Sequence, residues 1–112
     1  MRVIYNPCTD APFNLATEEW LLHNSDTDVF KLWRNAPAVI VGRNQNSHSE
    51  INTDYVQKHN IPVVRRLTGG GAVFHDLGNI NFTFISLNNQ SGLLDFRRFA
   101  TPIINALNAL GV

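Results

Sequence analysis

The residues with the clearest capacity for chemistry lie in one run, RRLTGGGAVFHD, from Arg65 to Asp76. Its three consecutive glycines are poor strand material, because glycine loses the most backbone freedom on folding and has no side chain to pack. If a strand leads into them, Arg66 and Thr68 lie on one face and Arg65 on the other. A guanidinium and a hydroxyl beside bare backbone amides form a nest for phosphate or carboxylate oxygens. The run therefore predicts an anion site in which one arginine of the pair joins Thr68.

The run does not match the standard phosphate-binding loops. No lysine follows the glycines, which excludes G-x-x-x-x-G-K-[ST], and AVFHD is typical of a strand rather than of the helix that follows G-x-G-x-x-G. From residue types alone, a glycine-rich bulge or tight hairpin with a solvated arginine pair is an equally good interpretation. Beyond the glycines, strand alternation places His75 on the same face as Val73, and Ala72 with Phe74.

Composition bounds the class of protein. The 112 residues suffice for one small domain with a single core. The formal net charge is zero, so no global field attracts nucleic acid or an acidic membrane, and any charge-based recognition is local. Cys8 is the only cysteine, which excludes an internal disulfide and a thiolate metal cluster and suits a reducing cytoplasm. With no signal sequence and no run long enough to cross a bilayer, we expect an intracellular soluble protein.

The hydrophobic pattern predicts an α+β fold with a mixed, mainly antiparallel sheet and flanking helices. Asn14 is predicted to cap the first helix and Asn52 or Thr53 the second. Turns at 34–37 and 76–79 are predicted to join successive strands, with a polar loop at 42–50. The predicted strands cover 2–5, 28–33, 38–42, 62–67, 72–76 and 79–87, and the predicted helices cover 15–24, 53–59 and a segment from Asp95.

The carboxyl-terminal segment has the pattern of an amphipathic helix. Its apolar residues recur at Ile103, Ile104, Leu107 and Leu110, and Pro102 predicts a kink or a late helix start. Gly111 is a natural helix stop, so Val112 is expected to begin something that follows.

Compared as a whole, RRLTGGGAVFHDLGNINFTFI resembles the signature of lipoate–protein ligases, in the biotin and lipoate ligase superfamily. The resemblance extends through NLATEEWLL, LWRNAPAVIVGRNQN and INTDYVQKHNIPVVRR and so covers nearly the whole chain in order. It implies that 1–112 is the amino-terminal portion of one catalytic domain with an incomplete ligase fold. The implied activity uses ATP and Mg²⁺ to convert lipoate to lipoyl-AMP and then acylates a lysine of a lipoyl domain. The implied partners are the E2 subunits of 2-oxoacid dehydrogenases and the glycine cleavage H protein, in the cytoplasm.

The resemblance also implies roles for particular residues. The lipoate pocket is expected at Trp33, Gly71 and His75, and we interpret His75 as a hydrogen-bonded structural residue rather than a general base, since a carboxylate is already ionised at neutral pH. For Trp33 a plain core role is equally open. Arg43 resembles an arginine in a loop near the family's pocket, but an arginine in a solvated loop without ligand contact is the stronger interpretation. The residues expected to bind ATP or lipoyl-AMP are Arg66, Thr68, Gly70, Gly71, Ala72, Val73 and Phe74.

One family feature is absent from the sequence. The family's catalytic lysine lies downstream of this region, and the lysines here, Lys31 and Lys58, have no matching context. We therefore expect that lysine beyond Val112, no catalytic residue or metal ligand within the chain, and no complete adenylation by this segment alone.

Two other functions stay open. An octanoyl or lipoyl transferase of the same superfamily would need a cysteine nucleophile, for which Cys8, outside the glycine run, is a poor candidate. A non-catalytic adenylate-binding module is the second alternative.

Beside the glycine run, Asn79 and Asn81 are expected to close a turn and to hold the glycine backbone by hydrogen bonds.

Overall fold

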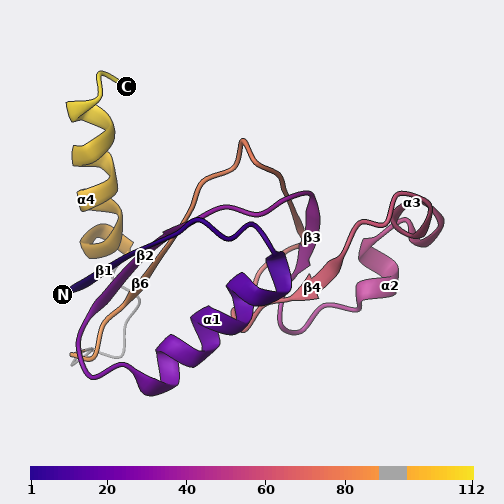
Figure 1. Ribbon diagram of the computed structural model, residues 1–112, viewed down its shortest axis with the longest axis horizontal. Helices are drawn as coiled ribbons and strands as arrows, with labels where there is room; N and C mark the ends of the chain where they lie inside the picture. Colours follow the sequence, from indigo (N-terminus) through magenta and orange to yellow (C-terminus); the bar gives the residue numbers. More distant parts are fainter. Residues whose placement is uncertain (89–95) are drawn as a thin grey trace.

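The computed structural model describes residues 1–88 and 96–112, and its strands form two three-stranded sheets (Figure 1). In the first, β2 (Val29–Trp33) lies between a parallel β1 (Arg2–Asn6) and an antiparallel β6 (Asn81–Ile85). In the second, β3 (Ala38–Val41) lies between a parallel β4 (Val63–Arg65) and an antiparallel β5 (Val73–His75). The α+β class with mixed pairing is confirmed, and each sheet has one parallel and one antiparallel pair.

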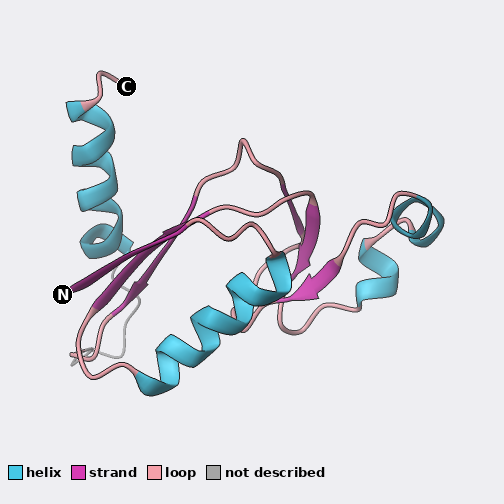
Figure 2. Cartoon of the chain, viewed as in Figure 1, coloured by secondary structure: helices cyan, strands magenta, loops and turns pink. Residues whose placement is uncertain are grey.

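The predicted turns join strands of different sheets. The chain leaves β2 at residues 34–37 to enter β3 in the other sheet, and it leaves β5 at 76–79 to return to β6. Neither turn is therefore a hairpin. The helices are α1 (Ala11–Asn24), α2 (Ser47–Glu50), α3 (Thr53–Lys58) and α4 (Phe96–Ala109), as Figure 2 shows.

Helix α1 packs against both sheets and holds them together. Its first half contributes Ala11 and Leu15 to a cluster with Trp33 and Ile40, and its second half contributes Leu21 to a cluster with strands of the first sheet. Full burial of one large apolar side chain, such as that of Leu15 or Leu21, contributes about 1.5–3 kcal/mol to stability. One helix thus fixes the relative position of β2, β3 and β6, the strands that border the site.

The predicted cap of α1 is wrong. The helix begins a turn earlier, at Ala11, and the Asp10 carboxylate accepts from Phe13 N at 2.9 Å. Asn14 is instead fully buried, and its amide donates to the carbonyls of Cys8 and Arg34 at 2.9 and 3.0 Å. A buried asparagine that satisfies backbone groups across the core cannot serve as a cap as well.

Other boundaries differ locally. The cap of α3 is Asn52, one of the two predicted candidates, and its side-chain oxygen accepts from Tyr55 N at 3.0 Å. The polar loop 42–50 contains the short helix α2, and the strand predicted for 62–67 ends at Arg65. Gly111, at φ +82°, follows α4 as expected, whereas Pro102 lies inside that helix and so does not start it. The predicted start at Asp95 lies outside the described residues.

Candidate functional site

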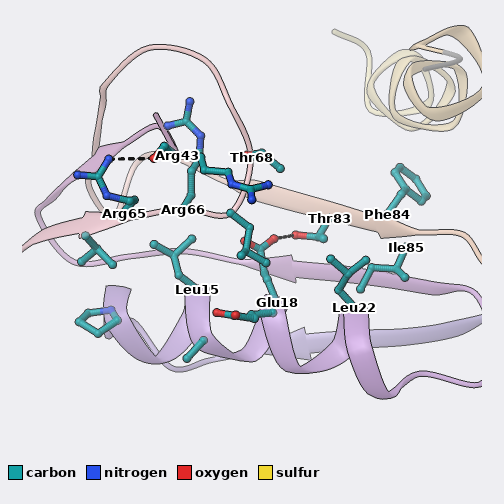
Figure 3. Close-up of a pocket in the computed structure, with 15 residues that line it drawn as sticks. Leu15, Glu18, Leu22, Arg43, Arg65, Arg66, Thr68, Thr83, Phe84 and Ile85 are labelled. Carbon is teal, nitrogen blue, oxygen red and sulfur yellow. Dashed lines mark hydrogen bonds between the residues drawn. The ribbon is translucent and has the colours of Figure 1, made fainter. Parts of the chain in front are cut away.

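Two adjoining cavities lie between α1, the β4–β5 loop and β6. Their volumes are about 480 and 280 Å³, and Leu15, Glu18 and Arg66 line both. In Figure 3 the arginine side chains lie on one side of the larger cavity and the side chains of α1 on the other. Small-molecule sites commonly have volumes of this order with a few polar groups in an apolar wall. The cavities together are therefore a candidate site with a common wall at Arg66.

Three arginines line the larger cavity: Arg43, Arg65 and Arg66, together with Thr68. Only one arginine of the pair was predicted to join Thr68 easily. Both arginines line the cavity, but the Arg65 guanidinium is bonded to the loop after β3, whereas Arg66 lies beside the glycine run (Figure 3). Since β4 ends at Arg65, strand alternation does not apply to the residues that follow. No carboxylate within residues 1–88 and 96–112 lies within ion-pair distance of these guanidinium groups, so the positive charge is available to an anion.

Arg66 holds the glycine run in its conformation. Its guanidinium donates to the carbonyls of Gly69 and Gly71, both at 2.8 Å, and to Ile40 O at 3.3 Å. The planar fork of arginine suits this bridging, because several N–H groups diverge from one rigid plane. Asn79 and Asn81 were expected to hold the glycine backbone, but Asn79 Nδ2 donates to Asn81 Oδ1 at 2.9 Å, and among the described residues Arg66 has that role.

Arg65 orders the neighbouring loop after β3. Its guanidinium donates to the carbonyls of Gly42, Arg43 and Gln45 at 2.9, 3.2 and 2.7 Å. The backbone joins the same two segments, because Arg43 N donates to Thr68 O at 2.9 Å. Arg43 itself is exposed, and its side chain has no partner in the described part of the chain. Of the three arginines, Arg43 has the most donors left for a ligand.

The glycines divide into two kinds. Gly70 has φ +98°, which favours glycine, and a Cβ on Gly42 would lie 2.0 Å from Gly70 O. Gly70 thus requires glycine because of its backbone conformation, and Gly42 because of its contact with the Gly70 backbone. The requirement at Gly42 was not predicted from the sequence, because that contact joins residues far apart in the chain. A Cβ on Gly69 or Gly71 would meet nothing within 4 Å. No described part of the chain forbids a side chain at those two positions.

Trp33, Val73 and His75 line the smaller cavity. Trp33 is also buried in the core, and its Nε1 donates to Thr83 Oγ1 at 3.0 Å. The rings of Trp33 and His75 meet edge to face with centroids 6.0 Å apart. His75 is buried and hydrogen-bonded as predicted, but its partner is Asn35, whose Nδ2 lies 3.0 Å from Nδ1, and not Asp76. Burial, assisted by the Arg66 charge, lowers the pKa of His75.

The other predicted site residues lie outside these walls. Gly70, Gly71, Ala72 and Phe74 are not among the described residues that line either cavity, although Arg66 bonds to the backbone of the same loop. Phe74 is 54% exposed. A backbone surface at this loop is thus present, and neither of the two cavities encloses it.

Glu18, which lines both cavities, has a buried lysine, Lys31, as its charged neighbour, and this pairing was not predicted from the sequence. Lys31 is fully buried between α1 and the first sheet, where Nζ donates to Asn14 O at 2.8 Å and lies 4.8 Å from the centre of the Trp33 ring. The Thr83 hydroxyl donates to a Glu18 carboxylate oxygen. Burial raises the pKa of Glu18, opposed by Thr83 and Lys31, and burial lowers the pKa of Lys31, opposed chiefly by Glu18. The alternation Val29–Lys31–Trp33 was the available signal, since it places the lysine on the tryptophan's face.

This pair predicts a pH effect on stability. Because the native pKa of Glu18 lies above its ordinary value of 4.5, the native state keeps a proton over a range in which the unfolded chain has released it. The stabilisation from Glu18 is therefore complete below pH 4.5 and is lost as the pH rises through the native pKa. Urea unfolding across this range should show the stability of the wild type falling relative to that of Glu18→Gln as pH rises. A constant difference between the two proteins would contradict this expectation.

Two further properties concern the described residues only. Residues 1–88 and 96–112 contain no group of three His, Cys, Asp or Glu side chains placed to hold a metal ion. No helix in this part of the chain combines the length and apolar character needed to cross a membrane.

The chain belongs to the lipoyl protein ligase A/B catalytic domain family, which residues 10–112 match. It is 47% identical over 109 residues to lipoate–protein ligase 1 of Staphylococcus aureus, covering 96% of this chain and 33% of that protein. It is 48% identical over 105 residues to the lipoate–protein ligase LplJ of Bacillus subtilis, covering 92% and 32%. The chain thus spans about a third of the length of these relatives.

Solved structures share the fold. A bipartite lipoate–protein ligase from Thermoplasma acidophilum, described together with its E2 lipoyl domain, has a TM-score of 0.86 at 32% identity over 99% of this chain and 46% of that one. A lipoate–protein ligase A bound with ATP has a TM-score of 0.81 at 30% identity, covering 98% and 47%. LipL1 of P. falciparum, in complex with lipoate, has a TM-score of 0.74 at 36% identity, covering 80% and 32%.

Proposed function

We propose that this chain forms the acyl- and nucleotide-binding portion of an ATP-dependent lipoate–protein ligase, as the amino-terminal part of one catalytic domain. The observation that carries the proposal is the pair of adjoining cavities, one lined by three arginines and one lined by Trp33 and His75, with Arg66 in the wall of both. An acid that reacts with a nucleotide needs such an arrangement, because its apolar tail and the anionic reaction centre must lie end to end. The ligases of known structure described above bind lipoate and ATP.

The arginine-rich half suits the phosphates. Arg43 has free donors, Arg66 lies at the junction, and Thr68 adds a hydroxyl. The exposed backbone of Gly71, Ala72, Val73 and Phe74 would lie against the nucleotide. The space beside Gly71 supports this placement, because no atom of the described chain lies within 4 Å of where a Cβ would be, which leaves room for a ligand.

The smaller cavity suits the acyl group. Trp33, Val73 and Leu15 supply apolar surface, and His75 and Arg66 supply polar groups in the same wall. We propose that the lipoyl chain lies along Trp33 with its carboxylate directed to Arg66.

The reaction proceeds in two steps. A carboxylate oxygen of lipoate attacks the α-phosphorus of ATP and pyrophosphate leaves, which gives the mixed anhydride lipoyl-AMP. The amine of an acceptor lysine then attacks the acyl carbon and AMP leaves. Both reactants of the first step are negative, so preorganised guanidinium groups at the junction offset their repulsion and lower the barrier.

The two lysines of this chain do not supply the catalytic ammonium group. Lys31 is fully buried and bonded to Asn14 O, and Lys58 is an exposed residue in the last turn of α3. Neither lysine lines either of the two cavities of the candidate site. The proposal therefore assigns that group to residues outside 1–112.

The proposed function also requires Mg²⁺, an acceptor protein and a cellular compartment that holds both. Mg²⁺ binds nucleotides largely through phosphate oxygens and water, so we propose that it enters with ATP. The acceptors are lipoyl domains, including E2 subunits and the glycine cleavage H protein, and a related ligase has been described with its E2 lipoyl domain. With Cys8 as a free thiol, the cytoplasm is the proposed compartment.

A cysteine-dependent transferase has less support. Cys8 lines neither described cavity, and its backbone carbonyl and amide are hydrogen-bonded to the side chains of Asn14 and Asn6.

The ligase proposal is tested with the complete natural polypeptide. We expect lipoate-dependent exchange of pyrophosphate into ATP and ATP-dependent lipoylation of an apo lipoyl domain. Acyl transfer that proceeds without ATP would overturn the ligase assignment, and nucleotide binding without exchange would favour an accessory module.

Replacing Gly71 with alanine tests the nucleotide surface. A Cβ there would meet no atom of the described chain, so we expect a change in stability of about 0.5 kcal/mol or less. If the nucleotide lies on this backbone, the KM for ATP should rise clearly in the exchange assay. Gly69→Ala is the matched control for stability, since its Cβ is equally unobstructed. An unchanged KM for ATP in Gly71→Ala would place the nucleotide elsewhere.

A further inference from the structure

The side chains of three asparagines form a chain that ends at His75. Asn6 Nδ2 lies 2.6 Å from Asn14 Oδ1, Asn14 Nδ2 lies 2.9 Å from Asn35 Oδ1, and Asn35 Nδ2 lies 3.0 Å from His75 Nδ1. Asn14 and Asn35 are fully buried, and 8% of His75 is exposed. Buried amides must satisfy their hydrogen bonds within the protein, so the direction of each bond along this chain is determined by its neighbours.

Backbone groups fix the direction at Asn14. The carbonyls of Cys8 and Arg34, which can only accept, face one end of the Asn14 amide, so that end is the NH₂ group. The Asn35 oxygen faces this NH₂ group at 2.9 Å, and the two N–H groups of Asn14 are shared among three acceptors. The reverse orientation of Asn35 is disfavoured, because two NH₂ groups at that distance repel each other and the Asn35 group would have no acceptor there. At the other end, Asn6 Oδ1 accepts from Cys8 N at 3.1 Å, which leaves Asn6 Nδ2 to donate to Asn14.

The direction of the chain decides the protonation of His75. With its oxygen facing Asn14, Asn35 presents NH₂ to His75 Nδ1, and a nitrogen that accepts a hydrogen bond carries no proton. We propose that this asparagine chain holds His75 as the Nε2–H tautomer, so that the ring offers the smaller cavity a hydrogen-bond donor and no base at Nδ1. The ligand group it would meet is a carbonyl or carboxylate oxygen of the acyl substrate, and this part rests on the proposed function.

The charged groups around the ring support a neutral imidazole. Arg66 and Glu18 line the same cavity, and Lys31 lies behind Trp33. Burial and the Arg66 charge both lower the pKa of His75, which favours the neutral ring. A neutral donor beside Arg66 can bind an anionic oxygen without adding a second buried cation.

The first test reads the tautomer directly. In the complete natural polypeptide labelled with ¹⁵N at histidine, long-range ¹H–¹⁵N spectra distinguish a protonated from an unprotonated ring nitrogen, and His75→Gln assigns the signal. We expect unprotonated Nδ1 and protonated Nε2 at pH 7 without any substrate. A protonated Nδ1, in either the other tautomer or the imidazolium, overturns the inference, and this result does not depend on ligase activity.

The second test reverses the bond. Asn35→Asp replaces the NH₂ group with an acceptor of similar shape, and the carboxylate should draw a proton onto His75 Nδ1 and shift its signal accordingly. Asn24→Asp makes the same change at an exposed position at the end of α1 and should leave the His75 signal unchanged. An unchanged Nδ1 signal in folded Asn35→Asp overturns the inference. If Asn35→Asp does not fold, the wild-type spectrum still decides it.

The third test separates a donor from a base. Gln can donate from its amide but cannot take up a proton, so His75→Gln should retain much of the exchange activity, whereas His75→Leu should raise the KM for lipoate by roughly tenfold or more. Equal loss of kcat in both variants would contradict the donor role. If the wild type shows the expected tautomer but no lipoate-dependent exchange, the proposed function fails while the tautomer assignment stands.

Discussion

Gly42→Ala is expected to displace the glycine loop and to abolish most lipoate-dependent exchange activity. The added Cβ would lie 2.0 Å from the carbonyl oxygen of Gly70, a backbone atom that cannot rotate away like a side chain. The two segments cannot simply separate, because Arg43 N bonds to Thr68 O and Arg66 N bonds to Val41 O on either side of the contact. Overpacking of this kind costs about 1–3 kcal/mol or more.

The measurement pairs stability with activity in the complete natural polypeptide. We expect a lower midpoint of urea unfolding and a large fall in kcat/KM for pyrophosphate exchange. Gly69→Ala is the matched control for stability, because its Cβ would meet nothing within 4 Å. If Gly42→Ala unfolds at the same urea concentration as Gly69→Ala, the close approach of the two loops does not exist in solution.

Arg66→Ala should produce the second large effect. The guanidinium bridges the carbonyls of Gly69 and Gly71 and lies in the wall of both cavities, so its removal frees the loop and deletes the positive charge at the junction. Loss of one preorganised donor at a developing charge typically lowers kcat by about 10²–10³-fold, and we expect a fall of that order in exchange activity.

Two variants make this result specific. Arg34→Ala removes a guanidinium that bonds only weakly to Leu77 O, at 3.3 Å, and lines neither cavity, so it should change activity little. Arg66→Lys keeps the charge but lacks the planar fork that reaches two carbonyls, and it should stay well below the wild type. Exchange activity of folded Arg66→Ala equal to that of Arg34→Ala would remove Arg66 from the site.

Several features could be read from local sequence. The apolar runs predicted the strands seen in residues 1–88, and Asn52, one of two candidate caps, and the Gly111 stop were also correct. These features depend on a residue's own backbone preference and on neighbours a few positions away, and periodicity and capping rules report such short-range effects. The glycine signature likewise pointed to the family, since RRLTGGGAVFHD is contiguous in the chain.

Only the tertiary structure decided which residues meet. Gly42 faces Gly70 across two loops, Lys31 is buried behind Trp33, and the Asn14 amide satisfies carbonyls instead of capping a helix. The arginine pair also joins one cavity, although alternation would have separated it. Each outcome follows from contacts between residues distant in sequence, where burial makes hydrogen-bond partners and free volume obligatory. Local patterns carry no information about such pairings. The sequence therefore identified the signature residues, whereas only the packed fold showed which residues they contact.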